Sequence, residues 1–212
     1  MIHADVLGER ARLSPERLAL VFVPTGERIT YAALDARAWR LALAWTGTLG
    51  LRPGDRVGLL AHNAVEFVDA VFASAKTGIV LVPLSTRATA KELEGIVADS
   101  GMRTLIYDGA FAGVASDLRS TTAVDTWIAL DAGQRSDPKD LALADVLAGV
   151  ADTAVRSARE SARGARPPEA ESPLFLLYTS GTTGKPKGVV GPHRTVAWNA
   201  CTTAMCRQLR ED

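Results

Sequence analysis

Residues 79–83 read Ile-Val-Leu-Val-Pro, an unbroken apolar run of the kind found in strands that are buried on both faces. The segment before this run, residues 65–76, places Val68, Val71, Phe72 and Ala75 on one side of a predicted helix. A short apolar strand is predicted further upstream, at residues 56–60. The order strand, helix, strand with short links predicts a right-handed βαβ unit and a parallel sheet.

The same alternation continues toward the C-terminus. Thr89 and Glu92 form the sequence pattern of a capping box, which predicts a helix that begins after Thr89, and further strands are predicted at residues 103–107 and 126–130. Asp137 followed by Pro138 predicts the start of another helix. The sequence therefore indicates the α/β class, with a parallel-rich sheet and flanking helices.

Two segments frame this alternation. Upstream, short strands at residues 18–23 and 28–30 precede a helix that Thr30 caps and Gly50 ends. Downstream, residues 151–172 are rich in Ala, Arg, Glu, Ser and Pro, which predicts a mobile linker or an insertion. We therefore divide the chain into an N-terminal α/β subdomain (1–150), this linker (151–172), and a segment with a buried strand, a loop and a helix (173–212).

Composition argues against several classes of protein. The 212 residues are 47% apolar and carry 24 basic and 24 acidic side chains, so no net charge attracts the chain to nucleic acid. No apolar run approaches the roughly 20 residues of a membrane span, and the first residues do not resemble a signal peptide. Two cysteines cannot form a disulfide framework, so a cytoplasmic location is predicted.

The loop after the predicted strand at residues 174–178 has the composition of a polyphosphate site. Glycines let backbone N–H groups approach an anion, hydroxyls donate single hydrogen bonds, and lysines supply charge. A solvated turn is the bland alternative, and we prefer the phosphate site because all three residue types coincide directly after a strand. The candidate phosphate-binding residues are Thr179, Ser180, Gly181, Thr182, Thr183, Gly184, Lys185 and Lys187.

The loop is not a Walker A motif, because Gly181 lies too close to Gly184 and Pro186 follows Lys185. Residues 178–189 instead resemble, throughout, the phosphate-binding signature of the adenylate-forming superfamily. That superfamily contains acyl- and aryl-CoA synthetases, peptide-synthetase adenylation domains and luciferases. Residues 29–34, 51–67 and 76–84 also resemble its N-terminal blocks.

The resemblance implies a partial N-terminal domain of an enzyme that uses ATP with Mg²⁺. A carboxylate attacks the α-phosphate, pyrophosphate leaves, and a thiol, usually that of CoA, takes the acyl group. In this scheme the hydroxyls and backbone N–H groups of the loop hold the β- and γ-phosphates, and Lys187 is the preferred source of positive charge. The expected partners are a small carboxylic acid, ATP, and CoA or a carrier-protein thiol, without nucleic acid or membrane.

Other parts that the resemblance implies are not found in these residues. They include an aromatic-acidic motif for adenine and Mg²⁺, an aspartate for the ribose, and a C-terminal catalytic lysine, so no catalytic residue and no metal ligand is assigned here. We expect a fragment that is inactive alone and that works with the remaining C-terminal part of the same enzyme. A non-catalytic nucleotide-binding or scaffold module and a fragment of a peptide-synthetase adenylation domain remain as alternatives.

Several further residues have competing interpretations. His193 follows Pro192 at a predicted helix start, where a structural role and a substrate contact are equally compatible with the sequence. Cys201 and Cys206 are predicted to be buried thiols, not zinc ligands, and Trp198 is predicted to pack in the core. Arginines between residues 156 and 166 are interleaved with Glu160, which predicts a solvated segment.

Overall fold

The computed structural model describes residues 5–163, 169–179 and 186–207. The first elements are α1 (Val6–Leu13) and a two-stranded antiparallel sheet of β1 (Leu18–Phe22) and β2 (Glu27–Thr30). Helix α2 (Tyr31–Leu43) follows, and its N-terminus is capped by the Thr30 hydroxyl, which accepts from the Ala33 N–H at 3.2 Å. A π-helical turn, η1 (Ala44–Thr48), extends α2 and buries Trp45 completely. The predicted capped helix is thus confirmed.

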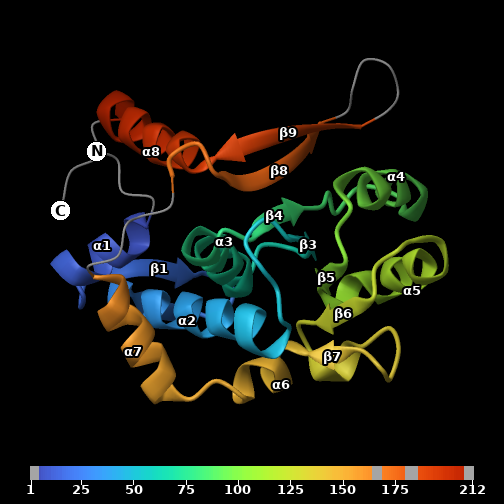
Figure 1. Ribbon diagram of the computed structural model, residues 1–212, viewed down its shortest axis with the longest axis horizontal. Helices are drawn as coiled ribbons and strands as arrows, with labels where there is room; N and C mark the ends of the chain where they lie inside the picture. Colours follow the sequence, from blue (N-terminus) through green and yellow to red (C-terminus); the bar gives the residue numbers. More distant parts are fainter. Residues whose placement is uncertain (1–4, 164–168, 180–185, 208–212) are drawn as a thin grey trace.

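A second sheet dominates the molecule (Figure 1). Its seven strands lie in the order β7-β6-β5-β3-β4-β8-β9, and every neighbouring pair is parallel except the antiparallel pair β8–β9. The strand bounds are β3 Arg56–Leu60, β4 Val80–Pro83, β5 Thr104–Tyr107, β6 Thr126–Ala129, β7 Leu141–Ala142, β8 Pro173–Thr179 and β9 Lys187–Pro192. This arrangement confirms the predicted parallel-rich sheet.

Helices cover both faces of the parallel strands. Their bounds are α3 Val65–Thr77, α4 Ala90–Ser100, α5 Ala112–Thr121, α6 Leu143–Ala148, α7 Asp152–Ala162 and α8 His193–Arg207, with short 3₁₀ turns η2 (Gly109–Phe111) and η3 (Ala132–Gln134). Successive strand residues point to opposite faces: Leu81 packs in one hydrophobic cluster with residues of α2 and α3, whereas Val82 packs in another with residues of α4 and α5. Both clusters exclude water from the sheet, which explains why the sequence of β4 is apolar at every position.

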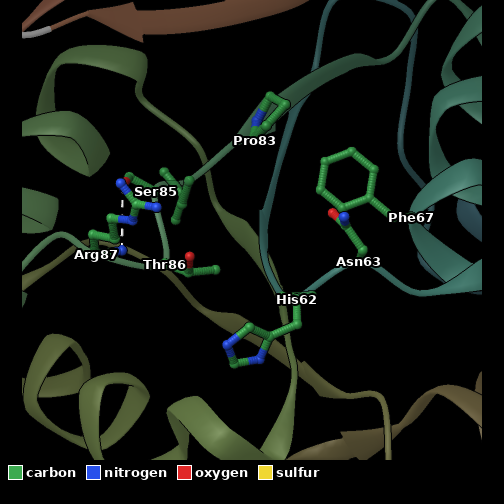
Figure 2. Close-up of a pocket in the computed structure, with 9 residues that line it drawn as sticks. His62, Asn63, Phe67, Pro83, Ser85, Thr86 and Arg87 are labelled. Atoms are coloured by element: carbon green, nitrogen blue, oxygen red, sulfur yellow. Dashed lines mark hydrogen bonds between the residues drawn. The ribbon is translucent and has the colours of Figure 1, made fainter. Parts of the chain in front are cut away.

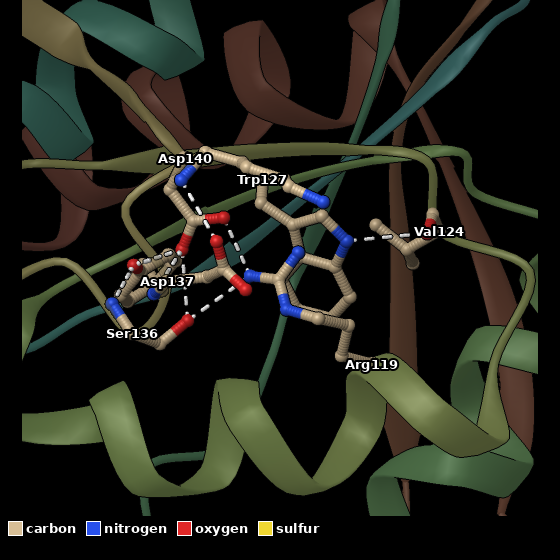
Figure 3. A network of polar contacts seen from close by, with 8 residues as sticks. Arg119, Val124, Trp127, Ser136, Asp137 and Asp140 are labelled. Atoms are coloured by element: carbon tan, nitrogen blue, oxygen red, sulfur yellow. Dashed lines mark hydrogen bonds and ion pairs between the residues drawn. The ribbon is translucent and has the colours of Figure 1, made fainter.

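The loop before β7 differs from the sequence prediction. Asp137 and Pro138 do not begin a helix, and α6 starts only at Leu143. The buried Asp140 carboxylate accepts from the Ser136 hydroxyl at 2.8 Å and the Arg119 guanidinium at 2.5 Å (Figure 3). It also accepts from the Tyr107 hydroxyl at 2.6 Å. Burial opposes the charge on Asp140, but these hydrogen bonds lower the pKa of its carboxyl below the ordinary value. The network holds residues 136–140 in a turn.

The segment predicted as an irregular linker contains a helix. Within residues 151–172, α7 packs against α2 (Figure 1), and Val155 is buried in the core. The Arg159 guanidinium donates to Asp35 at 2.7 Å, and Asp35 also accepts from the buried Lys76 ammonium at 2.8 Å. The sequence interpretation missed α7 because only one of its apolar side chains is buried, so its charged residues dominate the pattern. The division into subdomains stays a prediction.

Strand β8 exists as predicted but is not a buried strand. Only Leu174 is buried, and Leu177 is 43% exposed. Strand β9 was not predicted, and its Val189 and Val190 are 51% and 56% exposed. The two strands form a long hairpin at the end of the sheet, where helices do not cover both faces as they do at β3 and β4 (Figure 1).

Candidate phosphate-binding hairpin

The β8–β9 hairpin brings together two predicted phosphate-binding residues. Thr179 is the last residue of β8, Lys187 is the first residue of β9, and the two are direct cross-strand partners. Both are exposed. A hydroxyl and an ammonium group therefore stand at the end of the hairpin where β8 finishes and β9 begins, and each can reach an anion there.

The other predicted loop residues lie outside the described part of the chain. These are Ser180, Gly181, Thr182, Thr183, Gly184 and Lys185. Their assignment to phosphate stays a prediction.

Thr179 and Lys187 lie at the edge of the sheet where the parallel strands end. Strand β8 runs parallel to β4, with Leu81 opposite Phe175, so Thr179 lies beyond the carboxyl end of β4. In open α/β sheets, ligands bind at the carboxyl ends of the strands. The position of Thr179 and Lys187 thus agrees with a ligand-binding role.

The hairpin is attached to α4 next to Thr179 and Lys187. The Tyr178 hydroxyl donates to the Asp99 carboxylate at 2.6 Å. Burial and the neighbouring Asp99 carboxylate raise the pKa of the Tyr178 phenol above its ordinary value, so the phenol stays protonated as a donor near neutral pH. On the opposite strand, Gly188 is the register partner of Tyr178.

A pocket of about 720 Å³ opens at the same edge of the sheet, between the loops that follow β3 and β4. Figure 2 shows His62, Asn63 and Phe67 from the first loop and its helix, facing Pro83, Ser85, Thr86 and Arg87 from the second. The helices after β3 and β4 pack on opposite faces of the sheet, which makes this the kind of crevice where ligands bind in such folds. Its Arg87 guanidinium, hydroxyls and amide can donate hydrogen bonds to an anionic group.

Sequence reasoning missed this pocket and the contact of Asp99 with Tyr178. His62 and Arg87 lie in the loops after two predicted strands, so the rule that ligands bind at carboxyl ends could have identified the pocket. The sequence offers no comparable signal for Asp99, because its partner Tyr178 lies 79 positions further along the chain.

His193 is 3% exposed at the first position of α8, and its backbone N–H donates to the Ser172 carbonyl at 3.1 Å. This burial favours the structural interpretation of His193, and a substrate contact stays a prediction.

The predictions for two other kinds of residue on α8 were wrong. Cys201 and Cys206 are exposed, not buried, and Trp198 is 57% exposed instead of packed in the core. These three side chains lie on parts of α8 that the rest of the described chain does not cover, so they are exposed although the sequence favoured burial.

Two absences hold for the described residues. No cluster of three or more His, Cys, Asp or Glu side chains that could hold a metal ion occurs among residues 5–163, 169–179 and 186–207. Within the same ranges, no helix is both long enough and apolar enough to cross a membrane.

The structure defines an α/β domain with a mostly parallel sheet, in which Thr179 and Lys187 lie beyond the carboxyl end of β4. Residues 7–212 match the sequence model of the AMP-binding enzyme family, and the chain belongs to this family.

Several characterised relatives are ligases. The long-chain-fatty-acid–CoA ligase FadD13 of Mycobacterium tuberculosis is 38% identical over 195 residues, which are 90% of this chain and 35% of that protein. A feruloyl-CoA synthase of an Amycolatopsis species is 34% identical over 203 residues, 96% of this chain and 36% of that protein. A fatty acid–[acyl-carrier-protein] ligase, ScoC of Streptomyces coeruleorubidus, is 35% identical over 170 residues, 80% of this chain and 29% of that protein.

Solved structures agree with the fold. The inhibitor-bound N-terminal domain of FACL13 from Mycobacterium tuberculosis is similar with a TM-score of 0.74 and 36% identity, over 91% of this chain and 45% of that one. The anthranilate CoA ligase AuaEII in complex with anthranoyl-AMP has a TM-score of 0.79 at 24% identity, over 97% of this chain and 37% of that one, which supports the fold alone. The chain spans about a third of the length of the curated relatives that it matches.

Proposed function

We propose that this chain is the N-terminal part of an ATP-dependent carboxylic acid–CoA ligase. The observation that carries the proposal is the pairing of Thr179 with Lys187 where β8 ends and β9 begins. The surrounding sequence resembles the phosphate signature of the family. Relatives whose names include CoA ligase or CoA synthase support the reaction class. Because ATP and CoA are cytosolic metabolites, we place the enzyme in the cytoplasm.

The proposed reaction has two steps. An oxygen of the substrate carboxylate attacks the α-phosphorus of ATP, and the bond to the β-phosphate oxygen breaks, which gives an acyl-adenylate and pyrophosphate. A thiol sulfur then attacks the acyl carbon, loses its proton, and displaces AMP. CoA is the proposed acceptor. A carrier-protein thiol is the alternative, because the relative ScoC is named a fatty acid–[acyl-carrier-protein] ligase.

The contribution of the hairpin is electrostatic. One anion must approach another in the first step, and donors that are already oriented toward the departing pyrophosphate lower this cost. Thr179 can donate its hydroxyl, and Lys187 can place its positive charge on the β- or γ-phosphate. The other loop residues, from Ser180 to Lys185, complete the proposed site. Mg²⁺ would reach the site with ATP, and no step is assigned to it because the described residues contain no metal-binding cluster.

The first test uses the chain of 212 residues alone. We expect no ATP–pyrophosphate exchange with any carboxylic acid, because the chain spans only about a third of the relatives' length. Exchange is measured with radiolabelled pyrophosphate across fatty and aromatic acids. Robust exchange by the purified chain would contradict the proposal that the active site needs a further part.

The second test uses a protein of the relatives' full length that contains residues 1–212. Lys187→Ala should slow acid-dependent exchange, because it should raise the activation free energy by about 1.5–3 kcal/mol, the usual contribution of one charge-assisted contact. Lys91→Ala is the matched control, because Lys91 is an exposed lysine on α4 that pairs with Glu94 and does not belong to the hairpin. An unchanged rate for Lys187→Ala would remove this lysine from the mechanism.

A further inference from the structure

The hydrogen bond between Tyr178 and Asp99 lies close to both described phosphate-binding candidates. Tyr178 immediately precedes Thr179, and its cross-strand partner Gly188 immediately follows Lys187. Asp99 belongs to α4, which packs in the hydrophobic cluster on one face of the parallel strands. The bond therefore connects the end of the hairpin that carries Thr179 and Lys187 to the body of the domain.

Gly188 leaves space for the Tyr178 ring. A Cβ atom at Gly188 would lie 3.2 Å from Cζ and 3.3 Å from the hydroxyl oxygen of Tyr178, and 3.0 Å from Cδ1 of Leu176. Gly188 is not one of the glycines with positive φ, so its backbone conformation does not require glycine. The close approach of the ring is the physical reason for glycine at this position.

The end of the hairpin has little other support from the sheet. Strand β8 is registered with β4 at one pair, Leu81 and Phe175, and Thr179 lies four residues beyond it. From there the hairpin strands pair only with each other among the described residues, and Leu177 and Val189 are largely exposed. A hydrogen bond to a carboxylate is stronger than one between neutral groups, so the Asp99 contact is a substantial restraint on this end.

We infer that Asp99 is a positioning residue for phosphate binding: through the Tyr178 ring, packed across Gly188, it fixes the strand ends that carry Thr179 and Lys187. The inference rests on the proposed function of the hairpin. Asp99 touches no phosphate itself in this arrangement. It restricts the motion of Tyr178, and the antiparallel ladder transmits the restraint to both strand ends.

Hydrogen exchange of the 212-residue chain, followed by mass spectrometry, tests the restraint without reference to activity. Asp99→Ala and Tyr178→Phe should each raise the exchange rates of amides in residues 175–179 and 187–191 about tenfold, the factor that corresponds to loss of roughly 1.4 kcal/mol. The double variant should show no further increase, because both single changes remove the same bond. Asp99→Asn keeps an acceptor oxygen and should stay near the rates of the unmodified chain.

Two matched controls separate the restraint from general loosening. Asp125→Ala removes the exposed Arg103–Asp125 ion pair and should leave the exchange of the hairpin unchanged. Gly188→Ala should raise hairpin exchange because the tethered ring cannot move away, whereas Gly113→Ala, where a Cβ meets open space, should not. Unchanged hairpin rates in Asp99→Ala, or an increase spread evenly over the chain, would overturn the inference.

Titration with inorganic pyrophosphate provides the functional readout on the same chain. Asp99→Ala should weaken pyrophosphate binding several-fold, and Asp99→Asn should retain it. Equal affinity of Asp99→Ala and the unmodified chain, despite faster hairpin exchange, would overturn the positioning role. If the unmodified chain binds no pyrophosphate, the proposed function of the hairpin fails instead, and the exchange rates alone decide whether Asp99 restrains it.

Discussion

Strands β3 and β4 and the hairpin β8–β9 belong to one sheet but differ in how they are packed. Leu59 and Leu81 are 1% and 0% exposed between two layers of helices, whereas Val189 and Val190 are 51% and 56% exposed on opposite faces of β9. Strand β8 is apolar in sequence like β4, yet only Leu174 of β8 is buried. The comparison shows that β3 and β4 lie between two hydrophobic clusters, whereas the hairpin touches these clusters only through β8 and leaves Val189 and Val190 exposed, so the phosphate-binding candidates stand on the less firmly packed part of the sheet.

Truncation of a leucine in each region should give the largest contrast. Leu81→Ala should lower the free energy of unfolding by about 3 kcal/mol, because it leaves a cavity between two packed layers. Leu177→Ala should cost less than about 1 kcal/mol, because that side chain is already 43% exposed. Urea denaturation followed by circular dichroism measures both. Equal losses would show that the hairpin is packed as firmly as the core.

A valine-to-threonine pair sharpens the comparison with little change in volume. Val57→Thr buries a hydroxyl in β3, where the side chain is fully buried, and should cost about 2 kcal/mol. The same change at Val190 should cost roughly 0.5 kcal/mol or less, because water can still solvate the hydroxyl. Midpoints of chemical denaturation at constant slope provide the measurement. A cost at Val190 as large as that at Val57 would contradict the exposure of β9.

A charge on the exposed strand should have the smallest effect. Val189→Lys should change the stability of the 212-residue chain by no more than about 0.5 kcal/mol and should reduce its tendency to self-associate, because exposed apolar strands promote edge pairing. Analytical ultracentrifugation over a range of concentrations tests self-association, and Val23→Lys is the matched control, because it adds the same charge at an exposed valine in the turn between β1 and β2. A large loss of stability in Val189→Lys would show that β9 is covered in solution.

The fold was predictable from the sequence where local pattern and tertiary packing agree. The run at residues 79–83, the capping box at Thr89 and the short links between elements all indicate a parallel sheet, and β3 to β6 are present as expected. The prediction failed at Asp137 because a distant contact, from Tyr107 to Asp140, holds a turn where the local signal favours a helix. It failed at α7 because the ion pair of Arg159 with Asp35 stabilises a helix with few apolar residues.

The candidate site was predictable only in part. Composition and spacing predicted a phosphate-binding loop, which stays a prediction, and the structure shows that Thr179 and Lys187 are cross-strand partners. The pocket beside Arg87 follows two predicted strands and could have been inferred from their carboxyl ends, whereas the contact of Asp99 joins segments that meet only in the folded chain and leaves no signal in the local sequence. Burial of β8 was overestimated because an apolar run indicates that a strand favours a covered position, and the run cannot show which segment covers it.

The pairing of β8 with β4 has a consequence for the order of folding. Leu81 and Phe175 are neighbours in the sheet but lie 94 positions apart in the chain, so their contact closes a long loop, whereas β3 meets β4 after a single helix. Contacts of high sequence separation form slowly because their entropic cost precedes any stabilisation. We therefore expect β3 to β6 to assemble first and the β8–β9 hairpin to join them last.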